Sequence, residues 1–394
     1  MDISSVDLIN GITATDVLNF EEAPSRARRI VRDGDTIVST VRTYLKAIAS
    51  IASPPENMIV STGFAVIRPS SFINSRFLGY ALQNSAFVEG VVARSTGVSY
   101  PAINPSTLIS LSVAYPMEKD EQQHIADFLE WKTGQIDALI AKKQALIEKL
   151  KEKRLALITQ AVTKGLDPSA PLRDSGIQWL GALPDHWEVI PLGFLIRILG
   201  GMTPSMANSA YWEGDVPWVS PKDMKQSRIS NSIDHITEQA LAETSISLVP
   251  INSVLIVVRG MILAHSFPTA ITERPVTINQ DMKALQCDDK LEVEYLFWCL
   301  TGFAKVLTSL AQESAHGTRK IETDTLKKLP FPVPPNSEQR EICAQIAAQL
   351  NQLDRLAGKS EKTLASLTEY RTALITAATT GQIDVRRVAI PAQA

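Results

Sequence analysis

Apolar residues recur at helical spacing in two long stretches of the chain, residues 120–163 and 337–380. In the first stretch, this spacing connects Leu129, Ile136, Leu139, Leu146, Leu150 and Leu157. In the second stretch, the same register holds Ile346, Leu353, Leu356, Leu367 and Leu374. Such heptad patterns predict helices with one apolar stripe. Neither stretch contains proline, so each helix could extend for about 40 residues, roughly 60 Å.

The two helical stretches are copies of one another. The segment that starts at Glu121 aligns without a gap with the segment that starts at Glu338, an offset of 338 − 121 = 217 residues. Identical pairs include Gln122 and Gln339, Asp137 and Asp354, and Arg154 and Arg371. The similarity continues upstream, where Gly97, Ile103, Leu108, Leu111 and Pro116 match Gly317, Ile321, Leu326, Leu329 and Pro334. The chain is therefore predicted to hold two tandem copies of one unit.

The matched register also predicts how the two helices pack. An amphipathic helix of this length cannot bury its apolar stripe alone. We expect the two helices to pair antiparallel within one chain. The alternative is that each helix joins a separate bundle or pairs with another chain.

The remaining segments differ in pattern. They are rich in Val, Ile, Thr, Gly and Pro, and short apolar runs such as DTIVSTV and VLIVV alternate with turn residues. Such runs predict short strands. The expected fold class is α+β, with two tandem, mostly-β globules joined by two long helices that form an antiparallel intramolecular coiled coil. The predicted boundaries are 1–115 for the first globule, 116–165 for the central helix, 166–185 for a linker, 186–335 for the second globule, 336–384 for the C-terminal helix and 385–394 for a tail.

The first copy is shorter than the second. The second copy has a lead-in, from about Pro184 to Val219, for which the start of the first copy has no room. We therefore expect the first globule to be N-terminally shortened. The absence of a lead-in would remove apolar burial from the first globule and leave a sheet edge that should be paired or covered.

Composition narrows the class of protein. Apolar residues make up 45% of the chain and charged residues 21%, as in ordinary globular proteins. No apolar run approaches the length of a membrane span, and no secretory signal opens the chain. The cysteines, Cys287, Cys299 and Cys343, are few and widely spaced. We therefore expect a cytoplasmic protein with no disulfide framework and no contact with a membrane.

The sequence lacks the motifs of catalysis. It contains no phosphate-binding loop, no glycine-rich fingerprint for a nucleotide or methyl donor, and no nucleophile elbow. The histidines and cysteines have no metal-ligand spacing. We expect a non-catalytic protein that binds neither a cofactor nor a metal.

Short polar segments at the strand edges are the candidates for nucleic-acid contact. The net charge of −3 gives no global signature, so such contact must come from local basic clusters or from basic partners. Arg, Lys, Asn and Gln can pair with base edges, and Ser and Thr can hold phosphates. The candidates in the first copy are Arg42, Lys46, Arg94, Thr96 and Tyr100. The candidates in the second copy are Thr203, Lys222, Lys225, Arg259, Asn279, Gln280, Thr318, Arg319 and Lys320. The alternative is that these segments are ordinary polar loops, and we expect Trp212 and Trp218 in the core.

Over essentially its whole length the chain resembles the type I restriction–modification specificity subunit. The resemblance rests on LRDSGIQWLGALPDHWEVIPL from Leu172, on GGMTPSMANSAYWEGDVPWVSPKDM from Gly200, on STGFAVIRP from Ser61, and on the helix entries that follow Pro116 and Pro334. It implies two target-recognition domains, each of which reads one half of a bipartite site in double-stranded DNA. It also implies that the long helices dock two modification (methyltransferase) subunits, and that restriction (motor–nuclease) subunits join through the complex.

Two alternatives remain beside this reading. One is a scaffold that does not read DNA, or a degenerate, truncated specificity protein, and the other is an enzyme that acts alone on nucleic acid. The short first domain departs from the family pattern, so either the chain is a truncated form or its first reader is impaired. We expect the second globule to be the competent reader.

Overall fold

The computed structural model describes residues 1–313 and 317–391, which form two compact units. Unit 1 comprises Met1–Ile147 together with the chain from Gly358 onward, and unit 2 comprises Glu148–Ala357. Each unit therefore contains one globule and one part of each long helix.

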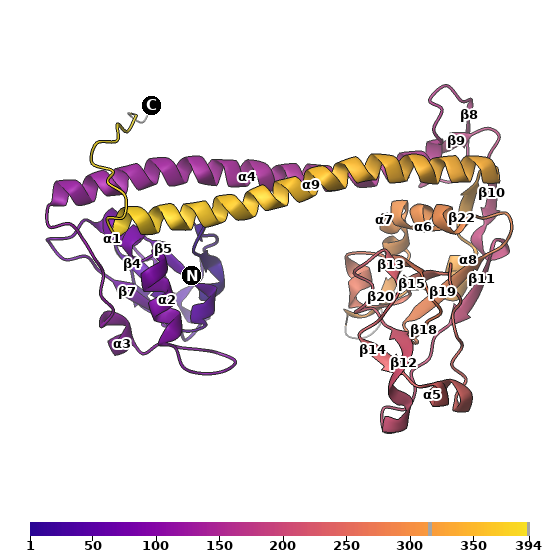
Figure 1. Ribbon diagram of the computed structural model, residues 1–394, viewed down its shortest axis with the longest axis horizontal. Coiled ribbons are helices and arrows are strands. Elements are labelled where there is room, and N and C mark those ends of the chain that lie inside the picture. Colours follow the sequence, from indigo (N-terminus) through magenta and orange to yellow (C-terminus); the bar gives the residue numbers. More distant parts are fainter. Residues whose placement is uncertain (314–316, 392–394) are drawn as a thin grey trace. The chain divides into compact units, whose positions relative to one another are not determined.

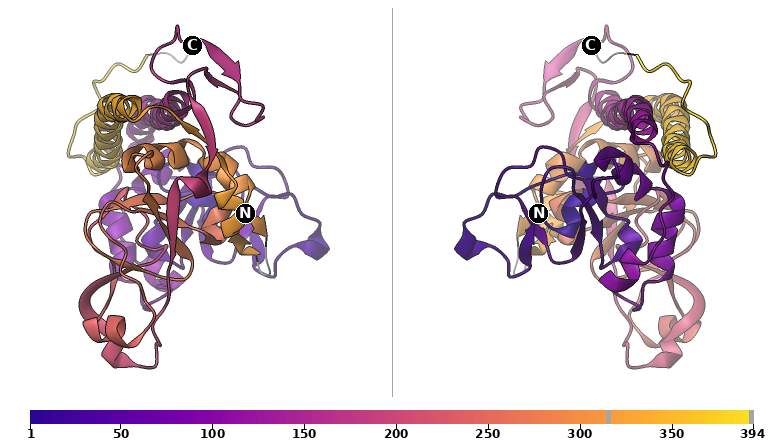
Figure 2. Two further views of the ribbon diagram at one scale, coloured as in Figure 1. Left: turned by 90° about the vertical axis from the view of Figure 1, so that its right-hand side faces the viewer. Right: turned by 90° about the vertical axis from the view of Figure 1, so that its left-hand side faces the viewer.

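The two long helices, α4 (Lys119–Lys164) and α9 (Asn336–Thr379), run antiparallel within each unit (Figure 1). Figure 2 views them nearly end-on and shows them side by side. In unit 1, Leu129 of α4 and Ile375 of α9 are buried in one apolar cluster. In unit 2, the end of α4 packs on the start of α9 in the cluster that contains Ile158. The predicted antiparallel pairing within one chain is confirmed.

The phase of the predicted stripe is wrong in the middle of α4. Leu139 is 47% exposed and Leu146 is 40% exposed, whereas the following residues, Ile140 and Ile147, are 5% and 7% exposed. Both phases share Ile136, because apolar residues lie both three and four positions beyond it. A helix turn of 3.6 residues permits either step, and packing selects the branched isoleucines.

The stripe of α9 shows the same kind of deviation. Leu356 is 52% exposed, although it lies three residues after the buried Leu353. Ser360, seven residues after Leu353, is 5% exposed. The helix keeps its heptad step at this point and buries a small polar residue in place of the leucine.

Two ion pairs join the helices at equivalent places in the two copies. In unit 1, Arg371 Nε of α9 lies 2.8 Å from Asp137 Oδ1 of α4. In unit 2, Arg154 Nη1 of α4 lies 2.6 Å from Asp354 Oδ1 of α9. Each arginine is the copy of the other, and so is each aspartate. Because the pairs join opposite ends of the aligned segments, they fit only an antiparallel arrangement.

Unit 1 is built around a three-stranded antiparallel sheet of order β5-β4-β7. Its strands are β1 (Val6–Asp7), β2 (Gly11–Ile12), β3 (Ala27–Ile30), β4 (Thr36–Ser39), β5 (Ile48–Ser50), β6 (Ile59–Ser61) and β7 (Phe64–Ile67). Its short helices are α1 (Ser75–Ala81), α2 (Ser85–Ala93) and α3 (Pro105–Ile109). Two further strand pairs, β1 with β2 and β3 with β6, flank the sheet.

Unit 2 is built around a five-stranded sheet of order β11-β19-β15-β17-β13. Its first strands are β8 (Leu172–Asp174), β9 (Ala182–Pro184), β10 (Glu188–Pro191), β11 (Ile196–Gly200), β12 (Trp212–Val219), β13 (Arg228–Ile229) and β14 (Asp234–Ile236). The later strands are β15 (Val254–Val257), β16 (Arg259–Gly260), β17 (Thr269–Thr272), β18 (Thr277–Ile278), β19 (Met282–Cys287), β20 (Gln312–Glu313), β21 (Arg319–Lys320) and β22 (Pro330–Val333). The short helices are α5 (Glu238–Glu243), α6 (Val293–Gly302), α7 (Ala304–Ser309) and α8 (Thr323–Lys327).

The two sheets share their central three strands. Strand β15 occupies in unit 2 the place of β4 in unit 1, and every residue of both strands is buried. The neighbours also correspond, β17 with β5 and β19 with β7. The β-branched residues Ile37, Val38 and Val254 favour the strand conformation at these positions. The copied part of the sequence therefore forms a copied core.

A buried glutamine ties each globule to its long helix. The Gln122 amide is fully buried, accepts from Asn74 N at 2.7 Å and donates to the Phe72 and Pro116 carbonyls. Gln339 is also fully buried and makes the copied set of bonds in unit 2, accepting from Glu292 N at 2.8 Å. All polar atoms of both amides are thus satisfied, as burial requires.

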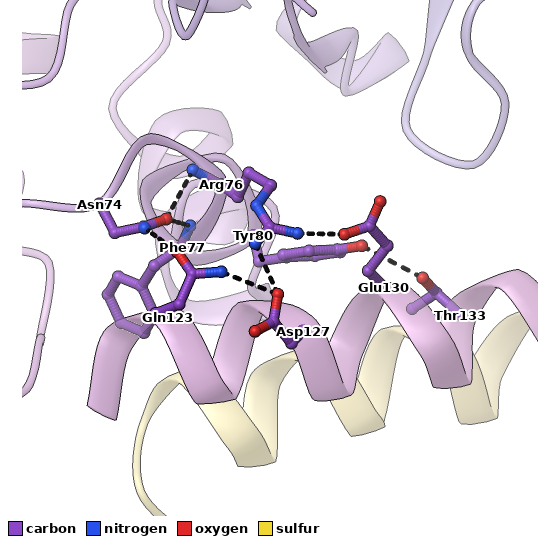
Figure 3. Close-up of polar contacts among 8 residues, drawn as sticks. All are labelled: Asn74, Arg76, Phe77, Tyr80, Gln123, Asp127, Glu130 and Thr133. Carbon is purple, nitrogen blue, oxygen red and sulfur yellow. Dashed lines mark hydrogen bonds and ion pairs between the residues drawn. The ribbon is translucent and has the colours of Figure 1, made fainter. Parts of the chain in front are cut away.

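In unit 1, charged contacts reinforce this attachment. Figure 3 shows Arg76 of α1 directed at two carboxylates on α4, those of Asp127 and Glu130. The Asn74 side chain caps α1 by accepting from the Arg76 and Phe77 amides, and it also donates to Gln123 at 2.6 Å. Helix α1 is therefore held against α4 along its length.

Within residues 1–313 and 317–391, no helix has an apolar stretch long enough to cross a bilayer.

Candidate nucleic-acid interface

A small ribbon in unit 2 gathers three of the predicted contact residues. Strands β16, β21 and β20 pair antiparallel, with Arg259 opposite Lys320 and Gly260 opposite Arg319. Like charges placed directly opposite on a ribbon destabilise it. The Lys320 ammonium lies 2.8 Å from the Glu322 carboxylate, and no ion pair to Arg259 occurs among the residues the structure describes. The ribbon therefore presents positive charge that an anionic ligand would neutralise.

Unit 1 brings the copied segments together in the same way. Single bridges join Val41 to Ala102 and Thr96 to Ala102, so that the loop at 41–46 lies beside the loop at 94–102. The guanidinium carbon of Arg42 lies 4.8 Å from the centre of the Tyr100 ring, a cation–π contact. Val41 and Ala102 are the copies of Arg259 and Lys320. Each unit thus builds its own polar surface from two segments that lie far apart in the sequence.

In unit 1, the turn after Val41 is held in an uncommon backbone conformation. Arg42 and Lys46 flank the turn at Thr43–Leu45 and have φ angles of 50° and 53°. Non-glycine residues rarely adopt this left-handed region. The buried Thr43 hydroxyl donates to Ser95 Oγ at 2.7 Å and ties the turn to the second loop. The turn is therefore positioned firmly, as a recognition loop requires.

Two exposed side chains were not among the predicted contacts. Tyr44 in unit 1 is 52% exposed, and Met261 in unit 2 is 69% exposed. Each lies in a short turn, two positions after a basic residue, Arg42 and Arg259 respectively. The signal that could have revealed them is a large residue after a basic position in both copies.

The lead-in of unit 2 adds a second group of predicted residues. The Thr203 hydroxyl is hydrogen-bonded to the exposed Gln280 amide. A Cβ on Gly201 would lie 2.0 Å from the Asn279 carbonyl oxygen, so only glycine allows this close approach. Asn279 itself is 6% exposed, and its side chain accepts from Asp281 N at 3.2 Å. Asn279 therefore shapes the loop that presents Gln280.

Two lysines lie at a hollow beside this group. Lys222 and Lys225 are exposed and line a hollow of about 290 Å³ together with Gln226 and Arg228. The Lys222 ammonium lies 3.6 Å from the Asp234 carboxylate. The hollow is basic and polar, which suits a phosphate more than an apolar ligand.

The other predicted positions are placed as follows. Arg94 is exposed at the end of α2 and donates to the Gly90 carbonyl at 3.3 Å. Thr318 is half-buried and directly precedes Arg319. Trp212 and Trp218 pack edge to face with ring centres 5.2 Å apart. Trp218 is buried in a small apolar cluster, as predicted, whereas Trp212 is only partly buried against it.

Comparison with known families gives one match that spans most of the chain. The family model described as the type I restriction modification DNA specificity domain matches residues 14–151 and 184–368. Most of both globules and most of both long helices lie within these ranges.

Curated relatives carry similar names. A type I restriction enzyme specificity subunit of Escherichia coli is 36% identical over 158 residues, which cover 40% of this chain and 39% of that protein. One from Methanocaldococcus jannaschii is 29% identical over 43% of this chain and 39% of its own length. These two matches thus span about two fifths of each relative. A specificity subunit of Haemophilus influenzae is 23% identical over 84% of both chains.

Solved structures share the fold. One chain from a type I R-M system superposes with a TM-score of 0.75 at 24% identity, over 97% of this chain and 91% of that chain. The HsdS subunit of Thermoanaerobacter tengcongensis gives a TM-score of 0.50 at 23% identity, over 97% and 90% of the two chains. At these identities the likeness concerns the fold alone.

Proposed function

The chain belongs to the type I restriction–modification DNA specificity family, and from that premise we propose that it reads a bipartite duplex DNA target, one half-site with each unit. The observation that carries the proposal is the repeated polar surface. Arg259, Arg319 and Lys320 in unit 2, and Arg42 and Tyr100 in unit 1, lie where the same two copied segments meet in each fold, although the individual residues are not copies of one another.

The chemistry of these surfaces suits base reading supported by phosphate contacts. Arginine can pair bidentately with guanine, while lysine and threonine hold phosphates. Arg259, Arg319 and Gln280 are the residues we assign to base edges. Lys222 and Lys225 line the basic hollow and are assigned to the phosphate backbone. Two similar readers in one chain predict two half-sites at a fixed separation.

The partners belong to the same proposal. Leu139, Leu146 and Leu356 expose large apolar side chains on the long helices, outside the helix pair. Leu139 and Leu146 lie seven residues apart on α4 in unit 1, and Leu356 lies on α9 in unit 2, so each unit offers its own apolar surface for another protein. We assign these surfaces to two modification subunits, which would carry the methyl-transfer site, and restriction subunits would join through that complex. The chain itself would be non-catalytic and work in the cytoplasm.

Selection from a random duplex pool tests DNA reading directly. The purified chain, with and without its modification partner, should enrich one motif of two conserved blocks separated by a fixed unconserved spacer. A matched pair of variants sharpens the test: Arg259→Ala should degrade one block, whereas Arg28→Ala, an exposed arginine outside both polar surfaces, should leave the motif intact. Recovery of no motif would favour a scaffold that does not read DNA.

A further inference from the structure

In unit 2, a tryptophan fills the junction between the globule and the two long helices. Trp187 is 1% exposed, and its indole N–H donates to Glu338 Oε1 at 3.1 Å. The residues that follow form β10, which pairs antiparallel with β22. A Cβ on Gly165, just after α4, would lie 3.3 Å from the indole ring. The indole and its strand therefore complete this junction.

Unit 1 has the same junction without a tryptophan. Glu121 occupies the place of Glu338, and residues 112–115 occupy the place of β22. Within the described part of unit 1, no strand pairs with residues 112–115. Tyr115 is 41% exposed, whereas its copy in unit 2, Val333, is 8% exposed. The edge that β10 covers in unit 2 is open in unit 1.

A cavity of about 340 Å³ lies at this place in unit 1. Glu121 and Ile125 of α4, Ala378 of α9, and Tyr115 and Pro116 of the open edge form part of its wall. The copies of Ile125 and Ala378 in unit 2 lie in the same apolar cluster as Trp187. The C-terminal residues Ile383–Arg386 complete the wall, and Val385 is buried in one cluster with Ile125 and Ala378. The cavity thus shares part of its lining with the site that receives an indole in the other copy.

The carboxylate in the cavity wall retains capacity to accept a hydrogen bond. Arg386 Nε lies 4.0 Å from Glu121 Oε1, and the same arginine pairs more closely with Asp384, at 2.9 Å. A carboxylate has about four acceptor positions. An indole N–H could therefore bond to Glu121 as Trp187 bonds to Glu338.

We propose that this cavity of unit 1 is a docking site for an extended, tryptophan-bearing segment of a partner polypeptide. The segment adds a strand to residues 112–115, places its indole in the cavity beside Ile125 and Val385, and donates the indole N–H to Glu121. The mode of binding is strand addition with one side-chain pocket.

Unit 2 shows what kind of segment fits such a site, a tryptophan followed by a strand. The segment of this chain that has this form, residues 184–191, is already engaged in unit 2, where Trp187 is buried. The occupant therefore comes from outside these residues.

The test uses a synthetic peptide with the sequence of residues 182–194, ALPDHWEVIPLGF, as the probe. The fluorescently labelled peptide is titrated into the full chain, and its anisotropy is recorded. We expect saturable binding at one site, with slower hydrogen exchange of the amides at 113–115. The peptide with Trp187→Ala should bind at least about tenfold more weakly, because it loses the buried ring and its hydrogen bond.

Two variants of the chain locate the site. Glu121→Gln should weaken binding about tenfold, because the indole N–H then bonds to a neutral amide oxygen in place of a charged carboxylate. Ala378→Phe should fill the cavity and abolish binding, and Glu121→Gln keeps the test valid if that larger change unfolds unit 1. Glu89→Gln, which alters an exposed carboxylate elsewhere in unit 1, should leave the affinity unchanged.

Three results would overturn the proposal: no saturable binding, equal affinity of the Trp187→Ala peptide, or full affinity of the Glu121→Gln chain. The assay contains no DNA, so its outcome is independent of whether the chain reads a target sequence.

Discussion

Units 1 and 2 share a centre and differ at their edges. Both hold the same three-stranded core, the same buried glutamine and the same helix-to-helix ion pair. Unit 2 adds β11 beside β19 and β10 beside β22. In the described residues of unit 1, neither β7 nor residues 112–115 has the corresponding partner. The copied residues specify helix attachment and the recognition turns, whereas the lead-in closes the sheet.

The largest expected effect comes from a charge in the helix seam. Leu129→Asp in unit 1 and Ile346→Asp in unit 2 each place a carboxylate at a buried position, where the side chains are 0% and 2% exposed. Each should cost several kcal/mol. Because unit 1 has fewer paired strands, we expect it to unfold first, at a lower urea concentration. Leu139→Asp, at an exposed position of α4, is the control and should shift the midpoint little.

The buried glutamines test whether the two attachments are equivalent. Gln122→Leu removes three hydrogen bonds and Gln339→Leu removes four, and each leaves buried backbone groups without a partner. Each should lower the free energy of unfolding by about 1–3 kcal/mol per group left unpaired, reduced where water enters. Urea titrations should give similar losses for the two variants. A loss of unfolding free energy in only one of the two variants would show that the copied contacts do not contribute equally to stability.

DNA binding should separate the two readers. Replacing Arg319 and Lys320 by Ala should reduce specific affinity at least tenfold, because a bidentate base contact contributes about 1–3 kcal/mol. Replacing Arg94 and Tyr100 by Ala should change the affinity less, because unit 1 lacks the surface that the lead-in adds to unit 2. The measurement is a gel-shift titration at fixed salt on the selected target. Equal losses would establish unit 1 as a full reader.

Cysteine labelling tests the order in which the two units unfold, and it has the smallest expected effect. Cys287, Cys299 and Cys343 all lie in unit 2, and burial raises the pKa of the Cys287 and Cys343 thiols to about 12. Thiolate is therefore scarce at pH 8 in the folded unit, and alkylation should follow the opening of unit 2. We expect protease cleavage in unit 1 to precede cysteine labelling as urea rises. Labelling that comes first would reverse the order of stability.

Sequence reasoning succeeded where a periodic signal extends over many residues. The long helices and their antiparallel pairing could be predicted, because one register recurs at two places in the chain. It was wrong at Leu139 and Leu146, because the adjacent Ile140 and Ile147 satisfy a second phase equally, and it was wrong at Leu356, where the helix buries Ser360 in its place. Only packing against the second helix decides between the alternatives.

The interface was predictable in composition but not in arrangement. Basic and polar loop residues could be named, yet nothing local to Arg259 indicates that it lies opposite Lys320. Asn279 illustrates the limit: its residue type suits base reading, but its side chain holds the turn that presents Gln280. The copied glutamines were visible as identical pairs, and their buried position explains why both copies carry an amide there.

The central claim is that the chain reads two half-sites, one with each unit. The most direct measurement maps methylated adenines across the genome of cells that carry the chain with its partners, comparing the unaltered gene, a deletion and the Arg259→Ala, Lys320→Ala double variant. The account predicts a bipartite methylated motif that disappears with the deletion and loses definition in one block alone with the double variant. A motif that survives the deletion, or that the double variant leaves unchanged in both blocks, would contradict it.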